Sequence, residues 1–543
     1  MVLTFDKNFK ETLFLSFILF ATLMPRLGAI DNNAIRWFTI SLVSIIYVFY
    51  SLRLGNSKFV ISKNHLVYAS LLFFYLLLSV FIAKNNVEGA IAFYKIVTLV
   101  IVFFISYDIF KKNNLLITLC TIFSFSIFIE TLVILIQFFD SFEAINGIAT
   151  NPNISSSSIL IKLPFVVFLI KKVKGKWYKL ILRMLEFMSI IGVIILGSRL
   201  GIISLFVIYF FYFFWYRKFR IAPIFTIGII ITLNFYINNL GNESNLRFNS
   251  FRAEKLINDE STNQRLNFYK KAINLSFEKP LFGYGIGSWK YESLPYEENN
   301  NKDFLIPYYT HNDFLQIFFE LGIIGVAGYL FFFIMLIKKI IAIETELRGF
   351  LIITFILFLL NSSLNFPLHR SQEVIPFILV SSMIFCLSNH KSEQKNKVSP
   401  YLFIGLVIPI MAISILEHNS LKIQKKLFSD YNLGTFSLSK DELGNINYLV
   451  PNLSANGVPL STYISRYHFE NKEYNKSLSL LNLSSKANYK DLMTQELLLK
   501  NYIFLGKNNL ALEMSKKLMS IYPENSLYSE IYYSLISDEK LKN

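Results

Sequence analysis

The chain has 543 residues, of which 53% are hydrophobic and 16% aromatic, while only 17% are charged. Charged residues make up about 25% of a typical soluble globular domain, so the composition excludes that class. The net charge of +16 could indicate nucleic acid binding, but residues 417–543 carry 15 basic and 13 acidic side chains, so nearly all the excess lies in short loops between apolar runs. This distribution is typical of a membrane protein, and no nucleic acid partner is expected.

Apolar runs long enough to cross a bilayer recur through the first 416 positions. We expect an all-α polytopic membrane domain over 1–416, with about 12–13 transmembrane helices. The first run has no small-residue cleavage site after it, so it is expected to be an uncleaved helix. The predicted spans are 11–24, 34–52, 65–83, 90–110, 114–139, 154–170, 180–197, 200–216, 220–240, 312–337, 349–366, 373–388 and 401–416.

Lysine and arginine cluster in alternate short loops, and a cytoplasmic N-terminus places all six clusters in the cytoplasm. The loop 241–311 and the tail 417–543 then lie outside the cytoplasm, together with 140–153, 197–200 and 366–372. The cysteines, Cys120 and Cys386, fall inside apolar runs, so no disulfide or cysteine metal site is expected. The basic clusters are Arg53, Lys58, Lys63; Lys111, Lys112; Lys171, Lys172, Lys174, Lys176, Lys179; Arg217, Lys218, Arg220; Lys338, Lys339; and Lys391, Lys395, Lys397.

Four charged residues fall inside predicted spans, where an unpaired charge is costly, so we expect internal ion pairs. They are Lys95, Glu130, Lys162 and Glu186.

Polar residues at the outer ends of spans form the first candidate site. Asn151 and Asn153 lie in ATNPNISSSS, and His369 and Arg370 in NFPLHRSQE. Arg199, in ILGSRLG, sits between two spans, and its guanidinium suits bidentate phosphate binding. The alternative is an interfacial arginine that extends toward headgroups.

The loop 241–311 contributes further positive charge. Arg247 and Arg252 precede an amphipathic helix that Arg265 opens, near the membrane surface. Pro280 ends this helix, and Gly283, Gly285 and Gly287 follow. This glycine pattern follows a helix rather than a strand, so we interpret it as a structural turn and not a dinucleotide site.

The stretch YYTHNDFLQIFFELGIIG, residues 308–325, places His311 at the mouth of an apolar helix. Asp313, Gln316 and Glu320 share one face of that helix, which should meet other helices or a wet cavity. Gly322 and Gly325 should admit a neighbouring helix. From spacing alone, the competing interpretation is a helix cap formed by Thr310 or Asn312, with an incidental histidine.

The tail 417–543 contains a weak internal repeat. Gly506, Ala511, Leu518 and Pro523 have the spacing of the second half of a tetratricopeptide repeat, and Ser477 lies 34 residues before Ala511. We therefore expect about two to three extracytoplasmic helical hairpins. Such an array could bind a peptide or partner protein, or could cap the membrane domain.

Taken in order, these motifs resemble the O-antigen ligase and O-antigen polymerase superfamily of membrane glycosyltransferases. The resemblance covers roughly residues 11–416. It rests on Asn-Pro-Asn at 151–153, Gly-Ser-Arg at 197–199, Arg265 with Pro280-Leu-Phe-Gly-Tyr-Gly, and His311-Asn-Asp-Phe-Leu-Gln with Glu320-Leu-Gly.

The resemblance implies transfer of a glycan from an undecaprenyl-diphosphate carrier to an acceptor hydroxyl, without a metal, cofactor or nucleotide sugar. It implies His311 as the base and Arg199 and Arg265 as the diphosphate-binding residues. Supporting roles fall to Asn153, Arg247, Arg252, Asn312, Asp313 and Glu320. The acceptor stays open between a lipid A core, another glycan and a protein; a flippase or a membrane scaffold are alternatives of other classes. The expected location is the inner, cytoplasmic membrane, with membrane lipids around the chain and a periplasmic C-terminal domain.

Overall fold

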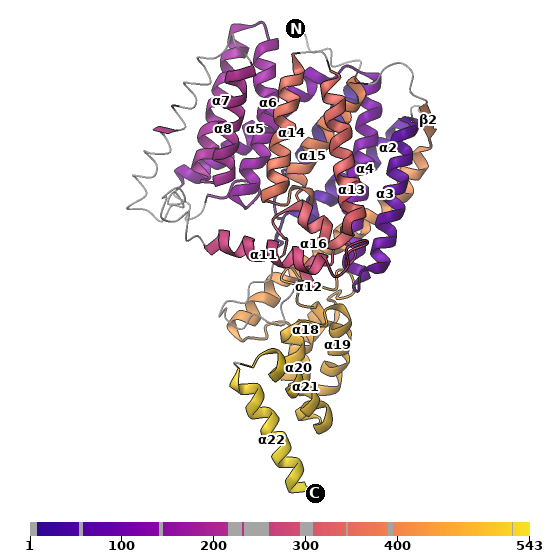
Figure 1. Cartoon of the computed structure of the whole chain (residues 1–543), viewed down its shortest axis with the longest axis vertical. Helices are drawn as coiled ribbons and strands as arrows, with labels where there is room; N and C mark the ends of the chain where they lie inside the picture. The colour runs from indigo at the N-terminus through magenta and orange to yellow at the C-terminus, as the bar shows by residue number, and fades with distance from the viewer. Residues whose placement is uncertain are drawn as a thin grey trace.

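The computed structural model describes residues 8–53, 58–140, 145–215, 228, 231–232, 260–293, 308–343, 346–388, 395–523 and 525–542. It consists of a helical bundle, two helices across one end of that bundle, and a second group of helices beyond them (Figure 1). The helices of the bundle are α1 (Phe9–Ala21), α2 (Asn33–Arg53), α3 (Lys63–Ile82), α4 (Asn86–Lys112), α5 (Leu116–Phe139), α6 (Pro152–Lys172), α7 (Lys176–Ile195), α8 (Arg199–Trp215), α13 (Asp313–Ile341), α14 (Leu347–Leu364), α15 (Ser371–Leu387) and α16 (Pro400–Leu433).

The predicted all-α membrane fold is confirmed. Within the described ranges, eight helices are long and apolar enough to cross a membrane: α2, α3, α4, α5, α6, α13, α14 and α16. Helices α1, α7, α8 and α15 also coincide with predicted spans, but they are shorter or more polar. The predicted span 220–240 lies outside the described residues except for positions 228, 231 and 232.

Helix α6 is the central element of the bundle. It packs against α5, α7, α8, α14 and α15, so nearly all its side chains are buried. Asn151 defines its start, because its side chain accepts hydrogen bonds from the N–H groups of Asn153 and Ile154 and Pro152 occupies the first turn.

The four predicted intramembrane charges are all paired, as expected. Lys162 on α6 meets Glu130 on α5, Lys95 on α4 lies 3.1 Å from Glu417 on α16, and Glu186 pairs with Arg183 at 2.6 Å. Each pair compensates part of the cost of removing its charges from water.

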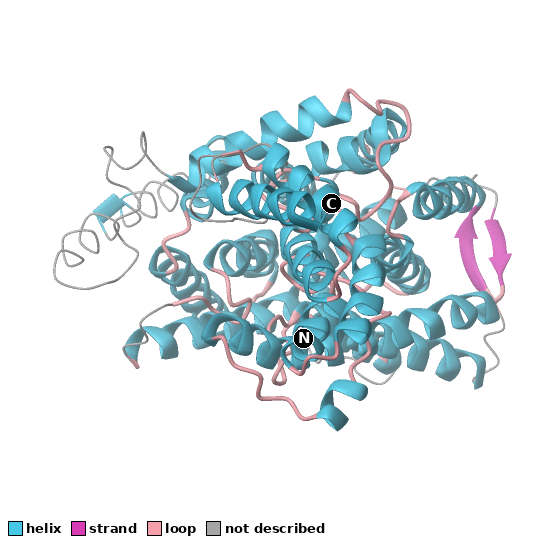
Figure 2. Ribbon diagram, turned by 90° about the horizontal axis from the view of Figure 1, so that it is seen from below, coloured by secondary structure: helices cyan, strands magenta, loops and turns pink. Residues whose placement is uncertain are grey.

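One end of the bundle collects the basic loops. Strand β1 (Phe59–Ser62) pairs antiparallel with β2 (Lys395–Val398), with Phe59 opposite Val398, at one edge of the molecule (Figure 2). Lys171 and Lys172 lie 3.5 and 3.1 Å from Glu346, which precedes α14. Loops that the basic clusters assign to one side of the membrane therefore touch one another.

The remaining helices follow the opposite end. Helices α11 (Glu260–Ser276) and α12 (Trp289–Glu292) lie across that end in Figure 1. The 3-10 helix η3 (Pro367–His369) lies between α14 and α15 in the chain. Beyond them come α17 (Lys440–Gly444), α18 (Leu460–Glu470), α19 (Tyr474–Ala487), α20 (Leu492–Phe504), α21 (Asn508–Ile521) and α22 (Ser526–Lys542).

The tail forms antiparallel helix pairs, in which α18 packs on α19 and α20 packs on α21. Ser477 and Ala511, the positions matched by the 34-residue repeat, are both fully buried. Their assignment to a tetratricopeptide array stays a prediction. Helix α16 runs without a break across residue 416, the predicted boundary between bundle and tail, and ends at Gly434 in the left-handed conformation.

Candidate active site

Helix α11 connects three of the predicted segments through one face. Thr262, Arg265 and Tyr269 are spaced at i, i+3 and i+7, so they project on the same side of the helix. Arg199 Nη1 donates to Thr262 Oγ1 at 3.4 Å, Arg265 Nη1 to the carbonyl of Leu364 at 3.3 Å, and the Tyr269 hydroxyl to the carbonyl of His311 at 2.9 Å. Arg199, Arg265 and His311 are therefore arranged around a single helix.

His311 lies just outside α13 in a backbone conformation that non-glycine residues rarely adopt, with φ of 58°. The Thr310 hydroxyl stabilises this reversal, since it donates to the Asn312 carbonyl at 2.7 Å and accepts from the Asn312 N–H at 3.1 Å. The imidazole packs edge-on against Phe366, with ring centroids 4.9 Å apart. Its Nδ1 atom is buried and has no hydrogen-bond partner within the described part of the chain.

Burial lowers the pKa of His311 to about 4, and the positive charges of Arg265 and Arg370 act in the same direction. The imidazole is consequently neutral at physiological pH. A neutral imidazole can accept a proton, which is the property required of a general base.

Asn312 and Asp313 hold the segment that carries Phe366. Asn312 caps α13 by accepting from the Leu315 N–H at 3.1 Å, and its amide donates to the Ser363 carbonyl at 2.9 Å. Asp313 is fully buried and accepts from the Leu368 N–H at 3.3 Å. The predicted cap of α13 by Asn312 is confirmed.

Glu320 contacts the glycine turn and does not contact His311. Its carboxylate accepts from the N–H groups of Gly287, at 2.9 Å, and Trp289, at 3.3 Å, and the amide of Gln316 donates to it at 3.2 Å. The predicted structural turn is confirmed, because Gly283, Gly285 and Gly287 all have positive φ.

Gly322 serves this turn as well, with φ of 61° and a position from which a Cβ atom would lie 2.3 Å from the Leu281 carbonyl oxygen. The prediction that Gly322 and Gly325 admit a neighbouring helix is wrong. The backbone that approaches Gly322 is the turn, and the atoms nearest Gly325 belong to its own helix.

Asn153 supports the corner that bears Arg199. The Ser198 hydroxyl donates to Asn153 Oδ1 at 2.8 Å and accepts from the Gly201 N–H at 3.2 Å, which caps α8. Asn153 also lines a small cavity of about 10 Å³ beside Ser157 and Asn361. Asn153 therefore shapes the backbone beneath Arg199. Arg247 and Arg252 lie outside the described residues.

A third guanidinium belongs to the same end of the bundle. Arg370 pairs with Asp31 at 2.9 Å, and its guanidinium carbon lies 5.3 Å from the centre of the Phe366 ring that His311 touches. Nearby, the buried Arg36 donates to the carbonyls of Met24, at 2.9 Å, and Ile148, at 3.1 Å.

The sequence places Arg370 among the outer polar residues without a specific role, and it assigns no role at the site to Tyr269 or Phe366. An aromatic residue four positions after Arg265 was the available signal for Tyr269. In the described ranges, no group of three or more His, Cys, Asp or Glu side chains could hold a metal ion.

Comparison with known proteins adds an independent observation. Residues 185–330 match the family described as O-Antigen ligase. A Rickettsia conorii protein with the provisional name polysaccharide ligase is 35% identical over 95 residues, which are 17% of this chain and 23% of that protein. The chain thus matches less than a quarter of its relative's length. The range 185–330 contains Arg199, Arg265, His311, Asp313 and Glu320, whereas Asn153 lies before it.

Proposed function

We propose that this chain, a member of the O-antigen ligase superfamily through residues 185–330, transfers a glycan from an undecaprenyl-diphosphate carrier to an acceptor hydroxyl. The observation that carries the proposal is the face of α11. It contacts Arg199 through Thr262 and His311 through Tyr269, while presenting Arg265 between them. Two cations and a neutral imidazole at one membrane end suit a diphosphate leaving group and a hydroxyl nucleophile.

The chemistry follows from these groups. The acceptor hydroxyl gives its proton to the imidazole of His311 as its oxygen attacks the anomeric carbon of the donor sugar. The bond between that carbon and the diphosphate oxygen breaks, and the diphosphate departs with the electron pair. Arg199 and Arg265 stabilise the developing negative charge. The proton held by His311 then passes to the released diphosphate, which restores the neutral base.

The proposed setting is the inner, cytoplasmic membrane, with the site on its extracytoplasmic side. The support is the distribution of charge, because the basic loops gather at the end opposite His311. The N-terminus would be cytoplasmic and the helices beyond α16 periplasmic. A lipid-linked donor would reach the site from the surrounding lipid.

Three acceptors fit this chemistry: a lipid A core, a further glycan repeat unit, and a serine or threonine of a protein. The paired helices of the tail favour a protein acceptor or protein partner, since stacked helical hairpins form concave peptide-binding surfaces. A flippase is the competing class, and it would be expected to carry internal repeats and polar residues distributed through the spans on both sides. The candidate residues Arg199, Arg265 and His311 lie together around α11 at one end of the bundle instead, which favours an enzyme.

The test is reconstitution of the purified protein with a lipid-linked oligosaccharide and each acceptor in turn. Transfer to one acceptor, lost in His311→Ala, would support the proposal and identify the acceptor. Deletion of the gene and complementation with the same variant tests it in cells. An unchanged surface glycan profile in the complemented strain would refute the catalytic role.

A further inference from the structure

The segment Tyr284–Ser293, which contains α12, is held by the bundle on one side. The N–H of Tyr284 donates to the Phe319 carbonyl and that of Gly285 to the Glu320 carbonyl, both at 2.9 Å. Together with the Glu320 carboxylate, these bonds fix the first half of the segment to α13. Trp289 is fully buried against Phe319.

The second half of this segment is held by the tail. Glu292, whose side chain is only 2% exposed, accepts from the Tyr489 hydroxyl at 2.8 Å and lies 3.3 Å from Lys490 Nζ. Lys490 Nζ also donates to the Glu292 carbonyl at 2.6 Å. Tyr489 and Lys490 lie between α19 and α20, so a residue nearly 200 positions away in sequence provides each contact.

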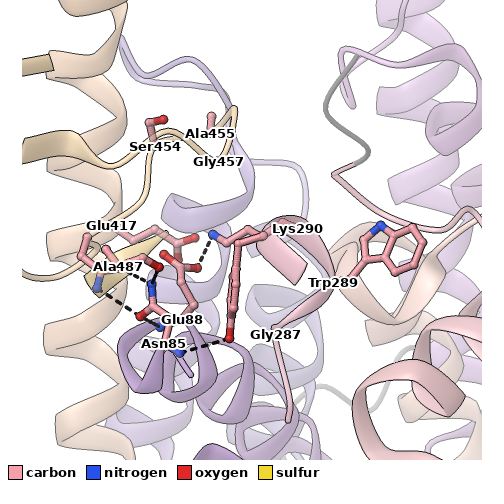
Figure 3. Close-up of polar contacts among 12 residues, drawn as sticks. Asn85, Glu88, Gly287, Trp289, Lys290, Glu417, Ser454, Ala455, Gly457 and Ala487 are labelled. Carbon is pink, nitrogen blue, oxygen red and sulfur yellow. Dashed lines mark hydrogen bonds and ion pairs between the residues drawn. The ribbon is translucent and has the colours of Figure 1, made fainter. Parts of the chain in front are cut away.

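The same part of the tail also holds the start of α4. Asn85 and Asn452 exchange amide hydrogen bonds at 2.9 and 3.0 Å, and Asn85 donates to the Ala487 carbonyl at 3.0 Å. The Tyr291 hydroxyl accepts from the Asn85 N–H at 3.2 Å, which ties this contact back to α12. Figure 3 shows Asn85 between Ala487 and the α12 segment.

Charges on the bundle side complete the arrangement. Lys84 lies 3.1 Å from Glu292 and donates to the Tyr489 hydroxyl at 2.6 Å, so it meets both partners. Lys290 pairs with Glu88 on α4, and Figure 3 shows Lys290 and Trp289 leaving the segment in opposite directions. Hydrogen bonds that involve a charged group are stronger than those between neutral groups. Such bonds connect α12 both to Glu88 of α4 and to Tyr489 and Lys490 of the tail.

This arrangement bears on the site because the segment follows α11 directly. On α11, Arg265 contacts Leu364 and Tyr269 contacts His311. In the segment Tyr284–Ser293, Gly287 is bonded to Glu320 of α13, and Glu292 is bonded to Tyr489 of the tail. A displacement of α12 would therefore pull on both α11 and α13. Misplacement of a catalytic group by about 1 Å can cost 100-fold in rate.

We propose that Tyr489 and Lys490 are positioning residues: by holding Glu292, the tail sets the placement of α11 relative to α13 and thereby of Arg265 relative to His311. This inference rests on the proposed function. It gives the tail a role in the transfer step itself, apart from any partner that it binds.

The test combines Tyr489→Phe with Lys490→Met in the full-length protein. Transfer of glycan from the lipid-linked donor should fall about 10-fold in kcat per folded molecule, with KM for the donor changed less. Lys490→Arg, which keeps the positive charge, should recover most of the loss. Tyr533→Phe with Lys500→Met alters two exposed tail residues of the same types and should leave transfer unchanged.

A double-mutant cycle with Glu292→Gln gives a second criterion. If the tail acts through Glu292, the effects of Glu292→Gln and of the tail substitutions on kcat should overlap rather than add. Additive effects, or a loss confined to protein yield with normal kcat in the folded fraction, would overturn the proposal.

Hydrogen exchange of the 284–293 amides provides a measurement that does not depend on activity. Exchange should accelerate in the tail variants, chiefly at the backbone groups that Glu320 and the α13 carbonyls bind. Faster exchange with no transfer by the wild-type protein on any acceptor would refute the proposed function and, with it, this role in transfer. Unchanged exchange would overturn the positioning role while leaving the proposed function intact.

Discussion

The buried pair between α5 and α6 and the site around His311 are both polar, but their pairing differs. Lys162 Nζ donates to Glu130, to Ser126 at 2.9 Å and to Ser158 at 3.2 Å, so its three donors are all used. At the other site, His311 Nδ1, Asp313 Oδ1 and Arg370 Nε are buried without a hydrogen-bond partner among the described residues.

Such atoms cost about 1–3 kcal/mol each, and they also occur elsewhere among the described residues, for example at Trp37. At the His311 site, however, three of them belong to titratable side chains that lie near one another. The comparison teaches that a buried charge alone does not identify a functional site. Incomplete hydrogen bonding of titratable side chains near Arg265 and Arg370 is the more informative feature.

The largest expected effect is a loss of transfer activity, without a loss of stability, when His311 is replaced. His311→Gln removes the base and should lower transfer by about 100- to 10,000-fold, while the unfolding midpoint in detergent changes little. Kinetics with a saturating lipid-linked donor measure the first quantity, and thermal unfolding the second. His468→Gln, in the tail, is the matched control. A variant that unfolds without a specific loss of rate would show that His311 is structural.

The next effect is expected at the interior pair and concerns stability. Lys162→Met leaves Glu130 buried without its cation, and losing one member of a buried ion pair costs about 3–5 kcal/mol. Folded yield and denaturant unfolding should fall, whereas the rate per folded molecule should stay near that of the wild type. Adding Glu130→Gln should restore part of the stability. If Lys162→Met folded normally but lost transfer, the distinction between the two regions would fail.

A smaller effect is expected from Arg199→Ala, which removes one cation from the proposed diphosphate site. Loss of a single charge-stabilising group typically costs about 100- to 1,000-fold in rate, and we expect the lower end because Arg265 remains. Donor use should weaken in assays with varied lipid-linked donor, with normal amounts of folded protein. Loss of expression would favour the interfacial role of this arginine.

The smallest expected effect is a dependence of the transfer rate on pH. Because burial and two guanidiniums lower the pKa of His311 to about 4, kcat/KM should be flat from pH 8 to about 5 and should decline as the imidazole gains a proton near pH 4. Arg265→Gln should move this acid limb to higher pH, since it removes a positive charge.

The same shift has a consequence for stability. The folded-state pKa lies below the unfolded value of 6.5, so the unfolded chain binds the proton more tightly and stability falls as pH drops below 6.5. An acid limb at pH 6.5 in the wild type would show that the imidazole is solvated and would contradict the buried geometry.

The membrane fold was predictable because apolar runs of bilayer length are compatible with few structures other than transmembrane helices. Asn151 and Asn312 are residues of a type that commonly caps helices, and they do cap α6 and α13. The roles of Glu320 and Glu417 were not predictable in the same way. Glu320 binds backbone N–H groups of a turn that precedes it by about 30 residues, and Glu417 pairs with Lys95 across 322 positions. Contacts between residues so far apart in the chain produce no repeating pattern in the local sequence from which they could be predicted.

The site was predictable in part. The order of the motifs along the chain identified Arg199, Arg265 and His311 as candidates, because each residue belongs to a distinct short motif. Tyr269 and Phe366 are ordinary aromatic residues in an aromatic-rich chain, so only their contacts in three dimensions distinguish them. The end of α16 also escaped prediction, because its apolar run stops near residue 416 while amphipathic spacing continues the helix to Leu433.

The continuity of α16 has a mechanical consequence. Because the bundle and the tail share one continuous helix, the number of residues between them sets the angular position of the tail about the helix axis. Each residue inserted near the junction would rotate the tail by about 100° and displace it by about 1.5 Å. The register of Tyr489 and Lys490 against Glu292 is thus a property of helix phase, and an insertion of about seven residues, two full turns, would restore the angle while separating the partners along the axis.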